Sequence, residues 1–415
     1  MDNILPLKIF YTKKEYFIFL SIIILIFVFN ILRLFFQYEN FKQEGLQELF
    51  PRVENVYTKK NYDFAKLKTK NFIFFTRLKK NSFKQGNLIR ILVLTKNISF
   101  IQFLKNPFLQ SLNTYKVKEK QTFKNHLKFI ISNEHKNNDI SSMYSAIFLG
   151  LGVTHNLRVF SSNFALAHLL ALSGFHLGII ALFIYFILNI FYSFFHRKYF
   201  PFRNKTFDLS IGVIVFCFLY LYFIDFAPSF LRAFMMYILA FFFLRRNIKI
   251  ISFGNLGLSL VLSLAFFPKY IFSLSLLLSY AGVFYIFLYL KYFSKLKKLY
   301  HLIFFNVWIF LSLLPIIHYF FTVSSFYQLL SPLFSLMFVV FYPLSLILHL
   351  LDIGNLFDKY FSFLFSLHIH TWNFKTNSIF LYFYLLLSSL SIFSKKAFYI
   401  MNLLLIIFGF LSFYL

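Results

Sequence analysis

The sequence predicts a polytopic α-helical membrane protein with a small external β domain. Of its 415 residues, 59% are hydrophobic and 23% aromatic, whereas only 13% are charged. A soluble domain of this length has no core large enough to bury so much apolar surface. Apolar runs of 17 or more residues also recur along most of the chain, and that is the length of a membrane-spanning helix. We expect about ten spans, some of them broken.

The chain is strongly basic, with 42 Lys and Arg against 14 Asp and Glu and a net charge of +28. Such a charge suits contact with anionic lipid or nucleic acid. A genome rich in A and T also raises the counts of Phe, Lys, Asn and Ile, so both explanations stay open. The single cysteine, Cys217, lies in an apolar run and leaves no internal disulfide.

Residues 1–36 are expected to form an N-terminal transmembrane anchor. The apolar run over residues 16–36 has about the length of one span, which exceeds the core of a signal peptide, and no cleavage site with small residues follows it. Lys8, Lys13 and Lys14 precede the run, and little basic charge follows directly. The positive-inside rule therefore places the N-terminus in the cytoplasm and the next segment outside.

Residues 37–140 are expected to form an external basic β domain. They hold 17 Lys and 3 Arg against 8 acidic residues, a net charge of +12. Strand-forming segments separated by turn signals predict short strands and tight turns, as in a small β-barrel. The predicted strands are residues 71–77, 88–94 and 98–103, with turns at 85–87 and 96–97.

Aromatic and basic side chains together suit a single strand of nucleic acid, because bases stack on aromatic rings and phosphates bind Lys and Arg. The aromatic candidates are Phe72, Phe74, Phe75 and Phe100. Each of them, taken singly, is better explained as a core residue.

Residues 141–415 are expected to form a multi-helix membrane domain. Residues 141–152 resemble a short amphipathic segment, and basic clusters at 196–198, 245–246, 291–298 and 395–396 mark loops. The expected spans are residues 166–194, 209–226, 229–244, 256–267, 271–293, 302–321, 326–350, 379–393 and 397–415.

Prolines interrupt or border several spans: Pro228, Pro268, Pro315, Pro332 and Pro343. Proline removes a helix hydrogen bond, and broken helices recur in transport proteins. Several of these prolines are expected only to end or kink a helix.

The most informative stretch is FALAHLLALSGFHLGII, which begins at Phe164. His168 and His176 lie in this apolar span, with a Ser173-Gly174 break between them. Polar and helix-loosening groups at membrane depth are costly, so they usually face a pore, a substrate or another helix.

Gly174 and Gly178 have the small-xxx-small spacing, which favours close helix packing over contact with a substrate. A serine-histidine nucleophile pair is disfavoured because no acidic third member lies nearby.

Few carboxylates remain after residue 140, as a path for a polyanion requires. These are Asp208, Asp225, Asp352 and Asp358. Asp225 and Arg232 lie seven residues apart, so on one continuous helix they would share a face and pair. A loop at 225–228 would instead put Arg232 one turn inside the next helix, with its side chain reaching towards the interface.

The phrase HLLALSGFHLG closely resembles the signature of the ComEC-type competence family, polytopic proteins that pass single-stranded DNA across the bacterial inner membrane. Three later segments resemble further family motifs in the same order, over residues 146–350. They are Ser229, Arg232, Ala233 and Met235 of a Ser-x-x-Arg-Ala-x-Met segment, Pro268 with Leu274 to Ser279, and residues 329–335 with Pro343. Ser331 and a shortened spacing depart from the last motif.

The resemblance implies an inner-membrane channel for single-stranded DNA in natural transformation, with an OB-like barrel as its external domain in the periplasm. It also implies partners, namely a cytosolic ATP-driven DNA translocase and periplasmic DNA-delivery proteins, besides the lipid bilayer. The expected DNA path comprises His168, Ser173, Gly174, His176, Gly178, Asp225, Ser229 and Arg232.

Many relatives add a C-terminal metal-dependent hydrolase domain. Here His368-Ile-His370 lacks the further Asp and His ligands of such a site, so we expect no metal, no cofactor and no nuclease. Phosphate-loop, dinucleotide-binding, zinc-protease and nucleophile-elbow motifs are also missing, so we expect no enzyme and no catalytic residue.

Two other classes of protein remain as alternatives. A polytopic glycan polymerase or lipid-linked sugar transferase should carry external Arg, Asp or Glu groups for its acceptor, and the loops here are short and poor in carboxylates. A secondary transporter of small anions usually shows repeated halves, and we find no internal repeat. Neither class explains the ordered motifs.

Overall fold

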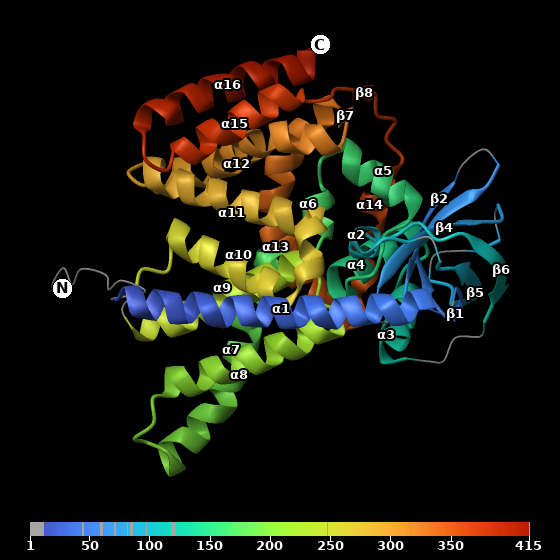
Figure 1. The fold of residues 1–415 in the computed structure, drawn as a ribbon. Coiled ribbons are helices and arrows are strands. Elements are labelled where there is room, and N and C mark those ends of the chain that lie inside the picture. The colour runs from blue at the N-terminus through green and yellow to red at the C-terminus, as the bar shows by residue number, and fades with distance from the viewer. Residues whose placement is uncertain are drawn as a thin grey trace.

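The computed structural model describes residues 12–43, 45–58, 61–69, 72–80, 82–83, 86–96, 98–117, 122–246 and 248–414. Lys8, Asn71, Gln85 and Asn97, which belong to the expected anchor, strand and turns, lie outside these residues. The chain is mostly helical, and a small β domain lies at one end of the helices (Figure 1).

Helices dominate because apolar segments of about 20 residues satisfy all their backbone hydrogen bonds internally. The helices are α1 (Lys13–Gln43), α2 (Phe100–Leu104), α3 (Phe123–Glu134), α4 (Asn138–Leu149), α5 (His155–Asn163), α6 (Ala167–Leu170), α7 (Gly174–Tyr199), α8 (Lys205–Phe223), α9 (Pro228–Arg245), α10 (Phe253–Phe266), α11 (Leu274–Phe293), α12 (Lys298–Phe320), α13 (Ser331–Leu350), α14 (Asp358–Phe365), α15 (Ser378–Leu390) and α16 (Lys395–Tyr414). Short 3-10 helices are η1 (Pro268–Phe272), η2 (Phe326–Leu330) and η3 (Gly354–Phe357).

Eight segments of the described chain are long and apolar enough to cross a membrane, so this is a multi-pass membrane protein. They are Lys13–Gln43, Ala167–Tyr199, Lys205–Phe223, Pro228–Arg245, Leu274–Phe293, Ile303–Phe320, Phe326–Leu350 and Lys395–Tyr414. Two more of the expected spans are helices of only 14 and 13 residues, α10 and α15. The expected number of about ten therefore becomes eight full-length candidates and two shorter apolar helices.

The β domain consists of two antiparallel three-stranded sheets, in the orders β1-β5-β6 and β2-β3-β4. Isolated bridges, Arg52 to Leu88 and Phe75 to Phe108, link the two sheets. In the described residues these sheets do not close into a barrel, so the expected OB-like barrel is not supported. The strands are β1 (Leu46–Leu49), β2 (Arg52–Thr58), β3 (Asp63–Lys68), β4 (Ile73–Leu78), β5 (Ile89–Leu94) and β6 (Ser111–Lys116), and a separate pair is formed by β7 (Val323–Ser324) and β8 (Trp372–Asn373).

The strands expected at residues 71–77 and 88–94 are confirmed as β4 and β5. The strand expected at residues 98–103 is wrong, because most of that segment belongs to helix α2. Ser99 Oγ accepts from the Gln102 amide at 3.3 Å, and Gln102 Oε1 accepts from the Ser99 amide at 2.9 Å. This reciprocal capping starts a helix and outweighs the β propensity of the flanking Phe and Ile.

Helix α1 joins the membrane part to the β domain without a break. Its 31 residues span about 46 Å, more than the roughly 30 Å of a hydrocarbon core. Within the helical bundle, Asn30 Nδ2 donates to the Ala265 carbonyl of α10 at 3.0 Å. Near the other end, Tyr38 and Phe41 are only 5% exposed and belong to the core of the β domain. The described part of the anchor expected at residues 1–36 thus belongs to a longer helix, Lys13–Gln43.

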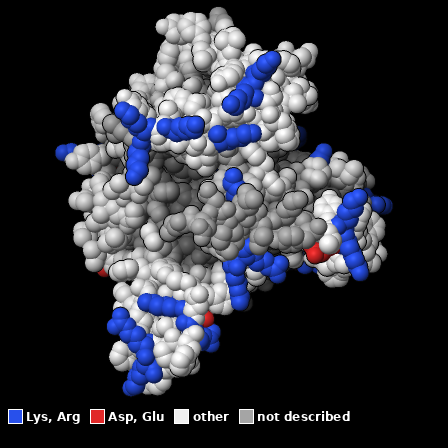
Figure 2. Space-filling model, turned by 90° about the vertical axis from the view of Figure 1, so that its left-hand side faces the viewer, with Lys and Arg blue, Asp and Glu red and all other residues white. Residues whose placement is uncertain are grey.

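Basic side chains collect at the end of the molecule where the N-terminus lies, opposite the β domain (Figures 1 and 2). The turns between α7 and α8, α9 and α10, α11 and α12, and α15 and α16 all lie at this end (Figure 1). The exposed cations of these turns are Arg197, Lys198, Arg203, Arg245, Arg246, Lys249, Lys295, Lys297, Lys298, Lys395 and Lys396.

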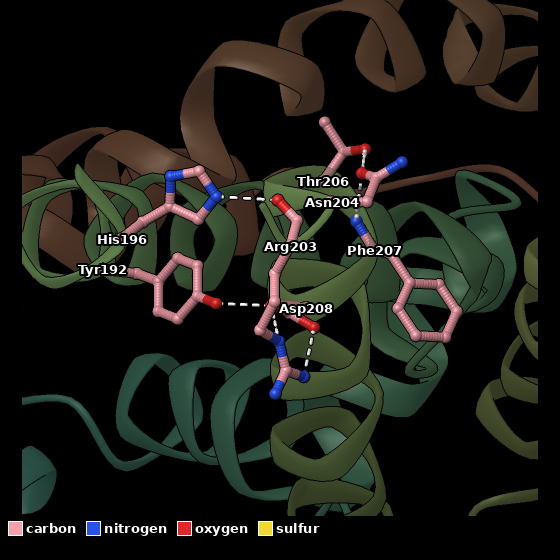
Figure 3. A network of polar contacts seen from close by, with 7 residues as sticks. All are labelled: Tyr192, His196, Arg203, Asn204, Thr206, Phe207 and Asp208. Atoms are coloured by element: carbon pink, nitrogen blue, oxygen red, sulfur yellow. Dashed lines mark hydrogen bonds and ion pairs between the residues drawn. The ribbon is translucent and has the colours of Figure 1, made fainter. Parts of the chain in front are cut away.

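The α7–α8 turn is held by a polar network (Figure 3). Arg203 donates from Nε and Nη2 to the two carboxylate oxygens of Asp208 at 2.8 and 2.7 Å, and Tyr192 also donates to this carboxylate. His196 Nε2 donates to the Arg203 carbonyl at 2.8 Å, and Asn204 caps the first turn of α8. Asp208 is thus neutralised at the basic end of the molecule.

The α1 contact generates a first prediction. Phe41→Ala removes a buried ring from the β-domain core and should destabilise that domain by about 3–5 kcal/mol. The matched control is Phe36→Ala in the same helix, because the Phe36 side chain is 65% exposed and its removal leaves no cavity in the protein. Limited proteolysis of the protein in detergent should show faster cleavage in residues 45–117 for Phe41→Ala alone. Equal protection of both variants would contradict the continuous α1 core.

Candidate functional site

The first part of the candidate site is a break in the helix at residues 171–173, between α6 and α7. The Ser173 amide donates to His176 Nδ1 at 3.1 Å, and Ser173 Oγ lies 3.1 Å from the same nitrogen. An amide that has lost its helical partner at membrane depth needs such an internal acceptor. The expected Ser173-Gly174 break is therefore present, and His176 stabilises it.

His176 is fully buried, and its ring packs edge-on against Tyr342 and Phe338 with centroid distances of 4.5 and 5.5 Å. Because Nδ1 accepts a hydrogen bond, the proton of a neutral ring lies on Nε2, which has no hydrogen-bond partner in the described chain. The structure thus puts His176 inside an aromatic cluster with α13, where its main contacts are structural.

His168, in contrast, is exposed. Its Nδ1 donates to the Ala165 carbonyl at 3.0 Å, and its Nε2 lies 3.1 Å from Ser335 Oγ on α13. Ala165 has a φ of 53°, a left-handed conformation in which a non-glycine residue needs support from its surroundings. Ser331 Oγ supplies a further contact by donating to the same carbonyl at 3.1 Å.

Arg232 lies on α9 and is only 9% exposed. Its Nε donates to Ser279 Oγ of α11 at 2.9 Å, and its Nη1 lies 3.5 Å from Met236 Sδ. One turn earlier, Ser229 Oγ lies 2.8 Å from Ser275 Oγ. The guanidinium therefore points into the protein between α9 and α11 and does not reach towards the interface.

Gly174 and Gly178 have different surroundings, although the sequence pairs them. A Cβ atom on Gly174 would lie 3.1 Å from Arg232 Nη2 and 3.3 Å from Ala233 Cβ. A Cβ atom on Gly178 would have no atom within 4 Å. Gly174 is therefore the glycine that allows α7 and α9 to approach closely, beside the guanidinium.

Asp225 does not pair with Arg232, because α8 ends at Phe223 and α9 begins only at Pro228. Of the two alternatives left open by the sequence, a continuous helix or a loop at residues 225–228, the structure contains the loop. Asp225 Oδ2 instead accepts from Lys68 Nζ at 3.0 Å and Lys124 Nζ at 3.2 Å. Arg232 makes no ion pair with a carboxylate in the described part of the chain.

The five prolines have two kinds of position. Pro228 is the first residue of α9 and Pro332 the second residue of α13, where the missing amide hydrogen costs nothing, and Pro268 begins η1 between α10 and α11. Pro315 and Pro343 lie inside α12 and α13, where each removes one helical hydrogen bond.

One polar cluster escaped the sequence analysis. His135 Nδ1 lies 2.8 Å from Asp358 Oδ1, and His135 Nε2 lies 3.1 Å from His349 Nε2. Glu134 Oε2 accepts from the Gly354 amide at 2.8 Å. These partners are more than 200 residues apart in sequence, so no local pattern indicates them. They tie α3 to α13 and α14.

In the described residues, no group of three or more His, Cys, Asp or Glu side chains is placed to hold a metal ion. His370, one of the two histidines considered for such a site, lies with its ring 6.2 Å from that of Trp372.

A family model described as "Competence protein" matches residues 152–414. The match covers α5 to α16 and thus the whole candidate site on α6, α7, α9, α11 and α13, whereas the β domain lies before it. No curated protein and no solved structure matches the chain.

The two glycines generate a second prediction. Gly174→Ala should displace the Arg232 head group, because the added methyl group lies too close to Nη2 and the neighbouring Ala233. We expect a lower thermal unfolding temperature in detergent. Gly178→Ala is the matched control and should be neutral or stabilising by up to about 1 kcal/mol, since Ala favours the helix. Equal unfolding temperatures for the two variants would contradict the close approach at Gly174.

Proposed function

We propose, from the premise that this chain belongs to the competence protein family, that it forms a conduit for single-stranded DNA across the bacterial inner membrane. Membership of the family gives a role in competence and DNA uptake, and the apolar helices make the chain a multi-pass membrane protein. The observation that carries the conduit proposal is the buried Arg232, which has hydroxyl and thioether partners but no carboxylate partner in the described chain.

A guanidinium at membrane depth is costly, by roughly 2.5–3.5 kcal/mol on insertion scales. Charged side chains within membrane spans usually pair with one another or with backbone carbonyls, and they mark substrate or ion pathways. Arg232 keeps its positive charge, and it lies beside the α6–α7 break. A phosphodiester carries one negative charge and suits the fork of a guanidinium. These features support a place for Arg232, Ser229 and His168 on the DNA path.

The β domain offers a second surface for a strand, on the outward face of the β2-β3-β4 sheet. Phe64 stacks on Phe75 and on Phe108, with centroid distances of 5.4 and 5.8 Å. Arg77 lies 5.9 Å from the Phe108 ring centre, and Tyr57 lies beside Phe64. Stacked rings with a nearby guanidinium form the kind of platform on which bases stack without regard to sequence.

Among the aromatic candidates of this domain, Phe74 is fully buried, and Phe72 and Phe100 pack against the core. Phe75 alone belongs to the outward face. The outward face of the β2-β3-β4 sheet is therefore the part of the β domain that we propose guides the DNA strand.

The charge distribution supports the orientation of the protein. Cytoplasmic loops of membrane proteins are enriched in Lys and Arg, and the basic turns lie at the end of the molecule where the N-terminus of the chain lies (Figures 1 and 2). That end is proposed to face the cytoplasm and an ATP-driven DNA translocase. The β domain is then periplasmic, where DNA-delivery proteins would present the strand. In this proposal the chain is a passive conduit, without catalytic residues or a cofactor.

A third prediction tests the path residues by transformation frequency and by protein abundance. Arg232→Ala should lower transformation at least tenfold, about 1.4 kcal/mol in the relevant step, while the protein accumulates normally. Arg232→Lys should retain part of the activity, since it keeps the charge but loses the fork. Arg246→Ala is the matched control, because Arg246 is exposed in the α9–α10 turn.

The variants of the two histidines should differ in transformation frequency and in protein abundance. His168→Ala is expected to lower transformation at normal abundance, whereas His176→Ala should mainly lower abundance, because it leaves the Ser173 amide unpaired. Normal transformation by Arg232→Ala and His168→Ala at normal abundance would contradict the proposed path.

A fourth prediction tests the orientation. In a Cys217→Ser background, a cysteine at Lys116 on β6 should react with a membrane-impermeant maleimide in cells whose outer membrane is permeabilised. A cysteine at Lys295, in the α11–α12 turn, should react only after the inner membrane is lysed. Both side chains are exposed, so access depends on the side of the membrane. The reverse pattern of labelling would overturn the orientation.

A further inference from the structure

Three elements meet at Asp225: the α8–α9 loop, the end of β3 and the first turn of α3. The carboxylate oxygen Oδ2 accepts from Lys68 Nζ at 3.0 Å and from Lys124 Nζ at 3.2 Å. Two ammonium groups thus share one carboxylate, which leaves a local net charge of +1. The Asp225 side chain is 53% exposed, whereas that of Lys124 is only 13% exposed.

The lysine pair is held in place by more than the carboxylate. Lys124 Nζ also donates to the Phe223 carbonyl at 3.2 Å and lies 5.3 Å from the centre of the Phe223 ring. Lys68 is the last residue of β3, whose neighbours in the sheet fix its backbone. Both ammonium groups would therefore stay near their positions if Asp225 moved away.

The same strand connects this cluster to the aromatic surface. Residues 64, 66 and 68 share one side of β3, because alternate residues of a strand point the same way and residues 63, 65 and 67 are buried. One side of β3 therefore leads from Phe64, through Lys66, to Lys68 and Asp225. Arg232 follows Asp225 by seven residues in the chain and lies on the next helix, α9.

We infer that Lys68 and Lys124 form a binding subsite for a backbone phosphate of the incoming strand, and that Asp225 occupies this subsite when no strand is bound. The inference rests on the proposed function. A phosphate oxygen and a carboxylate oxygen accept the same charge-assisted hydrogen bonds. Binding is then an exchange of anions, in which the phosphate takes both ammonium groups and the exposed carboxylate turns to solvent.

The electrostatics of the cluster agree with this exchange. Burial acts to raise the pKa of Asp225, but Lys68 and Lys124 outweigh it and lower the pKa, so the carboxylate is ionised at neutral pH. Burial lowers the pKa of Lys124, and Asp225 opposes that effect. Lys68 and Arg52 also act to lower it, so the surroundings of Lys124 are positively charged and favour an anion at this position.

The test uses the full-length protein in detergent and a fluorescent 20-nucleotide oligothymidylate, with binding followed by anisotropy at several salt concentrations. Asp225 has a φ of 56°, and Asn tolerates the left-handed region as Asp does, so Asp225→Asn keeps the backbone. Without the competing carboxylate, affinity should rise about three- to tenfold. The slope of log affinity against log salt should change by less than roughly 0.7, the value for one phosphate contact, because the exchange gives the wild-type protein the same contact.

Two comparisons make the test specific. Glu48→Gln removes the same charge from an exposed ion pair with Arg90 on the other sheet. It should leave the affinity for the oligonucleotide within about twofold of wild type, because exposed ion pairs contribute little. In a Lys68→Gln/Lys124→Gln background, which should itself bind more weakly, Asp225→Asn should have no effect.

Each outcome decides between the proposals. Equal gains from Asp225→Asn and Glu48→Gln would show an effect of overall charge and overturn the subsite. An unchanged or lower affinity of Asp225→Asn at an unchanged unfolding temperature would also overturn it, and would leave the proposed function standing. A folded wild-type protein that fails to bind the oligonucleotide at low salt would contradict the proposed function, and the subsite with it.

Discussion

The candidate site depends on one constraint: a backbone amide at membrane depth must find its partner inside the protein. The α6–α7 break frees the Ser173 amide, and His176 accepts from it. That bond fixes the His176 ring between Tyr342 and Phe338, which joins the break to α13. The next residue, Gly174, starts α7 against α9 and sets the distance to Arg232. The bond of the Ser173 amide, the contact with α13 and the approach of α7 to α9 thus lie within four residues of one another.

The acidic side chains that remain after residue 140 show how the protein manages its sparse negative charge. Asp208 is neutralised by Arg203 at the basic end, Asp225 by two lysines at the opposite end, and Asp358 lies against His135. Each of these three carboxylates lies near the end of a helix and binds a group outside its own helix. Arg232 lies about one turn inside α9 and, among the described residues, has hydroxyl and thioether partners. Charge counting along the sequence does not reveal that Arg232 has no carboxylate partner in the described chain.

The features that depend on local composition could be predicted from the sequence. Apolar segments located the long helices, and the phrase around Ser173 and Gly174 located the break. It did not predict what depends on distant contacts. Whether Asp225 binds Arg232 or a lysine is decided by Lys68, more than 150 residues away, and the equal spacing of Gly174 and Gly178 concealed their different neighbours. The strand at residues 98–103 failed for a local reason, since the capping pair Ser99 and Gln102 outweighed β-forming residues. The OB-like barrel came from the resemblance alone, and the pairing of the strands does not close it.

The continuity of α1 also has a consequence for biogenesis. Tyr38 and Phe41 belong to the hydrophobic core of the β domain, yet they are part of the helix that inserts into the bilayer. The hydroxyl of Tyr38 even donates to the carbonyl of Ile98, 60 residues later, at 2.8 Å. α1 precedes the strands in the chain, and the β domain completes its core only on the end of this helix. Folding of the domain is thereby coupled to the position of α1, because a displaced helix would withdraw Tyr38 and Phe41 from the domain's core.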